Sequence, residues 1–163
     1  MEHLVRAAQR GDPEAMDALV RELMPYVGRV CGAIALDRGD DAVQETFIAV
    51  LKSLGSLREP AALKGWVRRI AVRESIRSAG GRTVTMDPDT MPLPEVLPGD
   101  IATSLDIRAT LAALAPEQRA VLVLRDVDGL SEAEVARALS VPVGTVKSRV
   151  HRARAAFRGR WQP

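Results

Sequence analysis

A proline- and glycine-rich stretch, residues 80–105, most constrains what this chain can fold into. It contains four prolines, each of which removes a backbone donor and blocks a helical turn: Pro88, Pro92, Pro94 and Pro98. The residues on both sides show helical spacing, and a loop of this length is unusual inside one compact domain. We therefore expect an all-α chain with two small helical domains, residues 1–79 and 106–163, joined by residues 80–105 as a flexible linker.

The expected linker is acidic. Its single basic residue, Arg82, stands against four acidic ones, which gives a net charge of −3: Asp87, Asp89, Glu95 and Asp100. Fully extended at about 3.3 Å per residue, the segment would reach on the order of 80 Å. The chain is therefore expected to be two small helical domains joined by an acidic linker.

The composition indicates helices around an aliphatic core, because 47% of the residues are hydrophobic but only 3% are aromatic. The single cysteine, Cys31, excludes an internal disulfide, and its helical spacing from Val27 and Ile34 indicates a buried structural thiol. The first residues lack the apolar run of a signal peptide, and no stretch has the roughly 18 apolar residues of a membrane span. We expect a soluble, cytoplasmic protein that does not insert into a membrane.

Helical spacing predicts the elements of the N-terminal half. A first helix is expected over about 2–10, and Gly11-Asp12-Pro13 then supplies a turn, an N-cap and a proline at the first helical position. The second helix is expected to run through Met24 and a third to follow Pro25. Two further helices are expected over 40–54 and 61–78.

The C-terminal end has the pattern of a helix-turn-helix. Ser131 begins the first helix, and Glu134 follows three residues later, as in a capping box. The sequence VPVG, residues 141–144, interrupts that helix, and Thr145 is expected to cap the next. The second helix has a narrow apolar stripe at helical spacing, formed by Val146, Val150, Ala153 and Phe157.

The rest of this second helix is strongly basic, with six basic and no acidic residues between Val141 and Trp161. Four residues lie away from the stripe near the helix start, where a recognition helix meets base edges: Lys147, Ser148, His151 and Arg152. Four others are better placed for phosphates: Arg149, Arg154, Arg158 and Arg160. A solvated basic helix is the alternative, but the combination with a helix-turn-helix favours duplex DNA. His3 is the only other histidine, so a metal site at His151 is not expected.

The helix expected over 40–54 carries a possible protein-binding surface. Its core stripe is expected to comprise Val43, Phe47, Val50, Leu51 and Leu54. Another face repeats at helical spacing and combines an apolar side chain with polar ones: Asp41, Gln44, Glu45, Ile48 and Lys52. An exposed isoleucine beside carboxylates and an amide suits a protein partner better than a nucleic acid.

The helix that follows is basic. Five basic residues stand against Glu74 alone, which gives a net charge of +4: Lys64, Arg68, Arg69, Arg73 and Arg77. Trp66 and Ile70 repeat at helical spacing and are expected to anchor the helix to the core. A basic helix with an aromatic side chain near its start can follow a phosphate backbone and stack against bases, although a solvated helix with a core tryptophan is the alternative.

Three stretches of the chain resemble successive blocks of one protein family. They are DDAVQETFIAVLKSL, KGWVRRIA and LAPEQRAVLVLRDVDGLSEAEVARALSVPVGTVKSRVHRARAAF. They are similar to bacterial RNA polymerase sigma factors of the compact extracytoplasmic-function group, which has two conserved domains and a variable linker. The blocks cover more than half of the chain, and the last is the most specific because order, spacing and residue types all agree.

The resemblance implies roles for the surfaces described above. The face with Asp41, Gln44, Glu45 and Ile48 would bind the clamp helices of the large catalytic subunit of core RNA polymerase. The loop 55–63 and the helix with Lys64, Trp66, Arg69, Arg73 and Arg77 would read and melt the −10 promoter element, with one base flipped into a pocket near that loop. Gly144, Thr145 and the basic residues that follow, Lys147 to Arg154, would read the −35 element as duplex. A dedicated anti-sigma factor is a further expected partner.

The chain departs from the family pattern in the −10 helix. Where the family usually has an asparagine and, later, an aspartate, this chain has Arg73 and Arg77. The basic character of the helix is retained, whereas the promoter sequence that it prefers does not follow from the resemblance.

Other functional classes fit the sequence less well. We expect no enzyme, metal or cofactor, because the chain has no nucleophile–base set, phosphate-binding glycine loop or metal-ligand spacing. A stand-alone helix-turn-helix regulator would leave the N-terminal domain without a role. A sigma mimic that only sequesters an anti-sigma factor would not need the basic residues between Lys147 and Arg160.

Overall fold

The computed structural model describes residues 1–80 and 101–161, with only the backbone given for 101–105. The described residues form helices and turns without a β-strand, which confirms the expected all-α class. None of these helices is both long and apolar enough to cross a membrane. The predicted acidic linker lies mostly outside the described residues.

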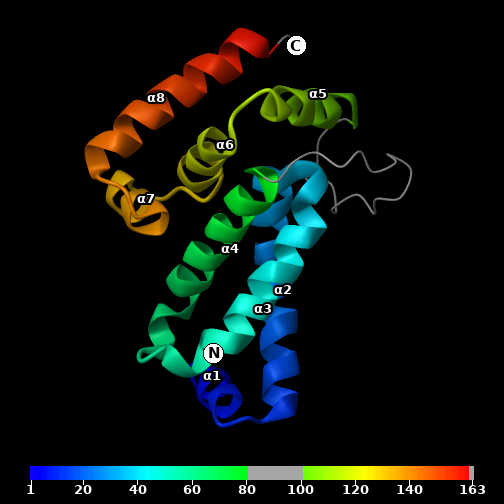
Figure 1. Ribbon diagram of the computed structural model, residues 1–163, viewed down its shortest axis with the longest axis vertical. Coiled ribbons are helices and arrows are strands. Elements are labelled where there is room, and N and C mark those ends of the chain that lie inside the picture. The colour runs from blue at the N-terminus through cyan, green and yellow to red at the C-terminus, as the bar shows by residue number, and fades with distance from the viewer. Residues whose placement is uncertain (81–100, 162–163) are drawn as a thin grey trace.

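The N-terminal half is a bundle of long helices. Helices α2 (Pro13–Ala35), α3 (Gly39–Ser53) and α4 (Leu63–Gly80) pack side by side, and α1 (Glu2–Gln9) crosses their lower end (Figure 1). Asp12 caps α2 as predicted, since its carboxylate accepts hydrogen bonds from the backbone of Glu14 and Ala15. The largest fully buried side chains of this bundle are aliphatic, among them Leu19, Ile34, Leu54 and Leu63.

Helix α2 continues through Pro25, so the prediction of a new helix after this proline was wrong. A proline inside a helix costs about 3 kcal/mol because one hydrogen bond is lost and the ring crowds the preceding turn. Here the ring is on the exposed face, while Leu23 and Val27 on either side are buried. Burial of this continuous apolar stripe outweighs the local preference of one residue.

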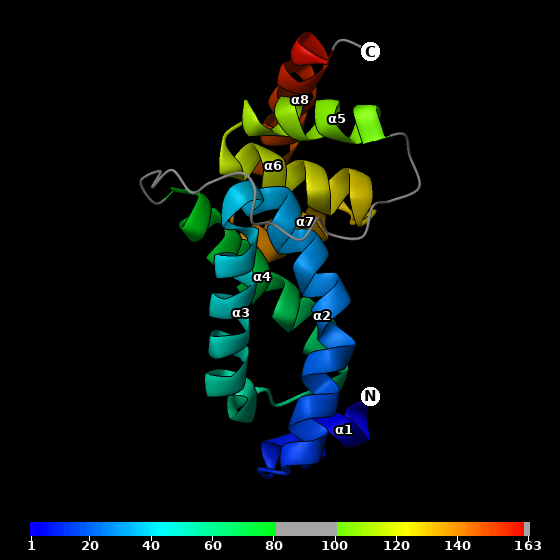
Figure 2. The ribbon, with the colours of Figure 1, turned by 90° about the vertical axis from the view of Figure 1, so that its right-hand side faces the viewer.

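The C-terminal half consists of α5 (Ile101–Ala112), α6 (Pro116–Leu122), a π-helical turn (Val123–Val127), α7 (Glu132–Leu139) and α8 (Val143–Arg160). Helix α5 begins at Ile101 rather than at about Asp106. Its start belongs to the segment that we expected to be linker. Helix α6 packs against α8 and also against α2 and α4, and α7 packs against α4. The two halves are therefore in contact, as the turned view also shows (Figure 2).

Candidate nucleic-acid interface

The α7–α8 pair has the geometry of a helix-turn-helix. The capping box at the start of α7 is formed as predicted, because Ser131 Oγ accepts from the backbone of Glu134 and Glu134 accepts from the backbone N–H of Ser131 at 2.8 Å. Ser140 ends the helix in the left-handed conformation, with φ 55°. Helix α8 then begins at Val143 with Pro142 as its N-cap, so the prediction that Thr145 caps this helix was wrong. The Pro142 carbonyl already accepts from Thr145 at 3.0 Å, which places Thr145 inside the first turn.

Buried side chains set the rotation of α8 about its axis. Val146, Val150 and Ala153 are buried, and Phe157 is half-buried and stacked on Trp161 at 5.9 Å between ring centroids. The rest of the helix is open to solvent at six of the eight residues predicted to contact the −35 element: Gly144, Lys147, Ser148, His151, Arg152 and Arg154. Thr145 and Arg149 are half-buried. The predicted stripe is therefore confirmed, and the predicted reading residues project to solvent from one face.

Two cations of this face have acidic partners within the chain. The Nε and Nη2 groups of Arg154 both donate to the carboxylate of Asp126, the Nε at 3.1 Å. This pairing raises the pKa of Arg154. Lys147 Nζ lies 3.8 Å from a carboxylate oxygen of Glu132. Sequence reasoning missed both acids, because they are distant along the chain and nothing in the local spacing links them to α8.

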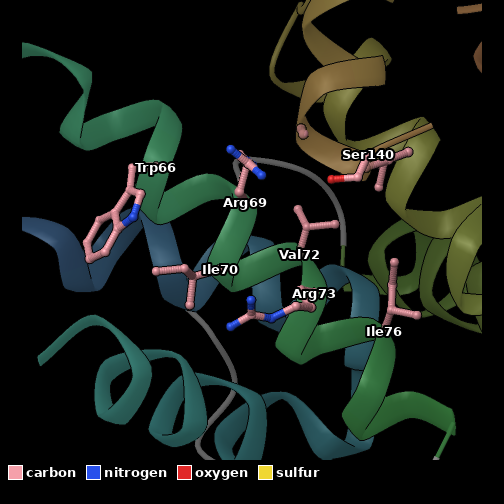
Figure 3. Close-up of a pocket in the computed structure, with 9 residues that line it drawn as sticks. Trp66, Arg69, Ile70, Val72, Arg73, Ile76 and Ser140 are labelled. Atoms are coloured by element: carbon pink, nitrogen blue, oxygen red, sulfur yellow. The ribbon is translucent and has the colours of Figure 1, made fainter. Parts of the chain in front are cut away.

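The predicted residues of α4 lie beside the end of α7. Trp66, Arg69 and Arg73 line a cavity of about 380 Å³ together with apolar side chains of α4 (Figure 3). The opposite wall is formed by Ala138 and Leu139 of α7 and by Ser140, the C-cap of that helix. Trp66 is half-buried and Ile70 is buried, as the expected anchoring requires. Lys64 and Arg77 are exposed on α4 but do not line this cavity.

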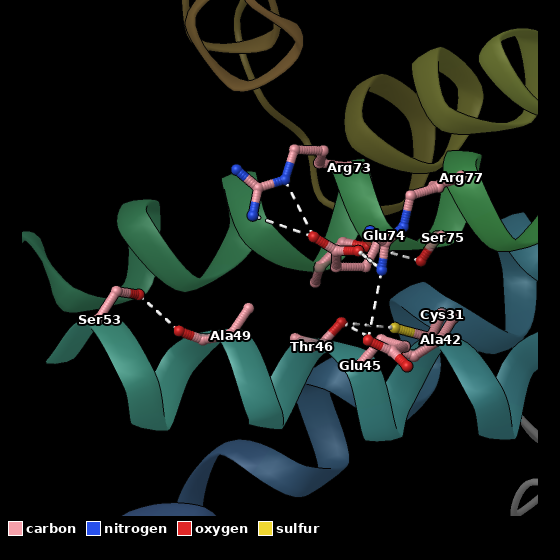
Figure 4. A network of polar contacts seen from close by, with 11 residues as sticks. Cys31, Ala42, Glu45, Thr46, Ala49, Ser53, Arg73, Glu74, Ser75 and Arg77 are labelled. Carbon is pink, nitrogen blue, oxygen red and sulfur yellow. Dashed lines mark hydrogen bonds and ion pairs between the residues drawn. The ribbon is translucent and has the colours of Figure 1, made fainter.

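A buried carboxylate lies beneath two of the predicted arginines. The side chain of Glu74 is 5% exposed, and it accepts a hydrogen bond from Arg73 Nε at 3.0 Å (Figure 4). Arg77 lies 2.7 Å from its other oxygen, in an ion pair rather than an aligned hydrogen bond, and also 3.3 Å from Glu45 of α3. Sequence reasoning counted Glu74 only as a charge. The structure adds that it holds both arginines.

The exposed face of α3 carries the residues predicted to bind a protein. Asp41, Gln44, Glu45 and Ile48 are all exposed. Leu51 was expected in the core, but it is 42% exposed and lies one turn after Ile48, which is 37% exposed. The buried side of α3 comprises Thr46, Phe47 and Val50, so the helix is rotated slightly from the expected stripe. This rotation enlarges the apolar part of the predicted binding face.

Cys31 is fully buried in this same bundle, and burial raises the pKa of its thiol. Its sulfur lies 3.7 Å from Thr46 Oγ1. Within residues 1–80 and 101–161, no group of three His, Cys, Asp or Glu side chains is arranged to hold a metal ion.

Comparison with known proteins gives the family. The profile for Sigma-70 region 2 matches residues 19–83, and that for Sigma-70, region 4 matches residues 104–157. The ECF RNA polymerase sigma-E factor of Escherichia coli (strain K12) is 33% identical over 181 residues, covering 98% of this chain and 93% of that protein. The chain belongs to the extracytoplasmic-function sigma factors. It is thus an alternative sigma factor that directs transcription initiation with RNA polymerase.

A second relative of this sigma factor is the ECF RNA polymerase sigma factor SigE of Mycolicibacterium smegmatis, which is 36% identical over 163 residues. That match covers 91% of this chain but 63% of the relative's length. Two solved structures share the fold. One is CnrH in complex with the cytosolic domain of CnrY, with a TM-score of 0.67, 24% identity and coverage of 97% and 94% of the two chains.

The other solved structure is the sigma factor RpoE in complex with the anti-sigma factor NepR from Bartonella quintana. It has a TM-score of 0.62 and 21% identity, and the match covers 88% of this sigma factor and 94% of that chain.

The region 2 match contains the α3 and α4 residues described above, and the region 4 match contains the α7–α8 pair.

Proposed function

We propose that this sigma factor reads promoter DNA with two separate surfaces, the start of α8 for the −35 element and α4 for the −10 element. The observation that carries this assignment is the orientation of α8. Its buried valines hold Ser148, His151 and Arg152 on the solvent side of the first turns, where a recognition helix meets base edges. Gly144 and Thr145 lie where the helix would enter the groove, and Lys147, Arg149 and Arg154 are assigned to this surface too.

Helix α4 supplies the second DNA surface. Arg69 and Arg73 beside the half-buried Trp66 combine positive charge with an aromatic ring. This combination suits the binding of separated DNA strands. When the strands separate, a base loses its stacking partners, and an aromatic ring can take their place. Lys64 and Arg77 extend the positive charge along the exposed side of the helix. Glu74 lowers the net charge of this surface and holds Arg73 and Arg77 in place.

Helix α3 is assigned to core polymerase, with Asp41, Gln44, Glu45 and Ile48 on the binding face. We add Leu51 to this binding face because its side chain is exposed beside that of Ile48. The domain boundaries complete the proposal. The first stays at about residue 79, and the second moves from about 106 to 101, where α5 begins, with one DNA surface on each side of the linker. An anti-sigma factor is proposed as the regulator, because the RpoE structure of the same fold holds one.

The test is to add the full chain to core polymerase and to map transcription starts across bacterial genomic DNA. We expect a set of starts that core polymerase alone does not give, sharing motifs near −10 and −35. The absence of new starts would contradict the proposal. Tight, sequence-specific binding to duplex DNA without polymerase would instead favour a stand-alone regulator.

A further inference from the structure

Gln9, the last residue of α1, holds the chain where it passes from α3 to α4. Its side-chain Nε2 donates to the backbone carbonyl of Leu54 at 3.0 Å and to that of Leu57 at 2.8 Å. A glutamine side chain has two N–H groups, both on this nitrogen, so the contact uses every donor that the side chain has. The acceptors lie 45 and 48 residues further along the chain, so folding rather than local spacing brings them to Gln9.

Gln9 caps the end of the α3 segment. Helix α3 is followed by a 3₁₀-helical turn, η2 (Leu54–Ser56), and the last carbonyls of a helical segment have no partner within it. Leu54 and Leu57 are both buried, and a buried carbonyl without a donor is costly. In the contacts that the structure describes, the Leu57 carbonyl accepts from Gln9 alone.

The connection from α3 to α4, residues 54–63, is fixed at regular intervals. Every third residue is buried and the two residues between each pair are exposed. The buried ones are Leu54, Leu57, Pro60 and Leu63. Helix α1 packs against the second 3₁₀-helical turn, η3 (Pro60–Ala62), at the lower end of the bundle (Figure 1). Apolar burial is not directional, so the hydrogen bonds of Gln9 add a directional constraint on this backbone.

The connection leads directly into the DNA surface proposed for α4. Leu63 is the first residue of α4, and Lys64 and Trp66 follow in its first turn. Arg58 of the connection is exposed and adds a positive charge just before this turn. A binding surface depends on neighbouring hydrogen bonds that hold its side chains in place without touching the ligand. Gln9 is placed to supply such bonds.

We propose that Gln9 is a positioning residue for the −10 surface. It fixes residues 54–63 and, through them, the start of α4 with Lys64 and Trp66. The role in DNA reading rests on the function proposed for α4, whereas the fixing of the connection does not. Gln9 precedes residues 19–83, which the profile for Sigma-70 region 2 matches, so the proposal extends the −10 unit to α1.

The first test is amide hydrogen exchange of the full chain, without polymerase or DNA. Gln9→Met keeps the length of the side chain but removes both donors. We expect exchange to become about tenfold faster at the amides of Leu57 and Ala62, which are hydrogen-bonded within the connection. His3→Met, at an exposed position of the same helix, should leave these rates unchanged.

The second test measures DNA binding by holoenzyme assembled from core polymerase and each variant. The probe is a fluorescent single-stranded DNA that carries the −10 sequence of a mapped start. Gln9→Met should weaken binding of this DNA about tenfold. It should leave the affinity for core polymerase unchanged, because the face proposed to bind polymerase is on α3. Gln9→Lys, whose ammonium group also donates, should restore most of the DNA binding.

Unchanged exchange in folded Gln9→Met would overturn the proposal. Faster exchange with unchanged DNA binding would overturn the role in reading −10 and leave only the cap. Equal losses of affinity for DNA and for core polymerase would mean that Gln9 merely stabilises the fold. Gln9→Glu, which has the same shape but an acceptor in place of the donor, decides by the same measurements if Gln9→Met does not fold. If the wild-type holoenzyme gives no new starts, the proposed function fails, and exchange still decides whether Gln9 fixes the connection.

Discussion

At the scale of single residues, Arg119 is unusual because its charged guanidinium group is buried. It is 5% exposed and donates to the carbonyls of Ile34, Leu111 and Leu114, at 2.6, 3.2 and 2.7 Å. Burial lowers its pKa, while Glu117 acts in the opposite direction. Arginine suits this place because its planar fork can donate in several fixed directions, which a lysine cannot do.

Arg119→Met should therefore destabilise the protein strongly. Three carbonyls lose their donor, so we expect the free energy of unfolding to fall by about 3 kcal/mol. Urea denaturation followed by circular dichroism measures it. Arg119→Lys should restore only part of the loss, and Arg10→Met, at an exposed position, should change little. An equal loss in both methionine variants would contradict the role of the buried hydrogen bonds.

Arg152 is the residue on which base reading by α8 is best tested. It is exposed, and its only described contact is to Ser148 of its own helix, at 3.3 Å. If Arg152 makes a bidentate base contact, Arg152→Ala should weaken −35 use by about 1–3 kcal/mol and relax discrimination at one base pair. Transcription from a panel of single-base −35 variants measures this. A uniform loss over the panel would make Arg152 a phosphate contact.

At the scale of elements, α7 depends on its cap. Ser131→Ala removes the hydroxyl that accepts from the backbone N–H of Glu134, and it should cost about 1 kcal/mol of stability. Hydrogen bonds from the Ser131 hydroxyl and backbone lower the pKa of Glu134. The stabilisation from this carboxylate is thus present above the ordinary Glu pKa of about 4.3 and is lost as the pH falls through the lower folded-state value.

Unfolding measured at several pH values separates these effects. The difference between the wild type and Ser131→Ala should be largest near neutral pH and should shrink below about pH 4. A difference that is constant over this range would show that the Glu134 charge is not involved.

Helix α2 should be stabilised when Pro25 is replaced. Pro25→Ala restores a donor for the Arg21 carbonyl at an exposed position and removes no packing, so we expect a gain of about 1–3 kcal/mol. Urea denaturation measures it. Glu22→Pro, which places a proline at another exposed position of the same helix, should have the opposite effect. A loss of stability in Pro25→Ala would mean that the proline relieves a strain of the helix.

At the scale of the whole molecule, the contact between the two halves should contribute to stability. Arg29 of the N-terminal half donates at 2.8 Å to Asp128 of the C-terminal half, whose side chain is 4% exposed. Arg29→Ala leaves this buried carboxylate with one partner fewer, so we expect the free energy of unfolding to fall by about 1–2 kcal/mol. Arg21→Ala, at an exposed position of the same helix, should change it little. Urea denaturation followed by circular dichroism measures both, and an equal effect of the two substitutions would contradict the role of the contact.

Much of the local structure was predictable because it depends on near neighbours. The Asp12 cap, the Ser131–Glu134 capping box and the stripe of α8 each lie within a few turns of one helix. The errors at Pro25 and Leu51 have a common cause, because each assigned a boundary or a face from local preference and packing against other helices decided otherwise. The error at Thr145 was local, since α8 begins two residues earlier, at Val143, with Pro142 as its N-cap.

The sequence by itself determined the helical class, the division into two halves, the family and the faces that carry charge, because all of these follow from periodicity and from residue types in order. Only the tertiary structure decided that Arg154 is paired with Asp126, that Glu74 is buried beneath two arginines and that Asp128 is bound from the other half. Arg154 and Asp126 are far apart along the chain, and so are Asp128 and its partners. Glu74 is close to its arginines in sequence, but only packing decides which side of its helix is buried. Their proximity comes from chain folding, which local spacing does not encode.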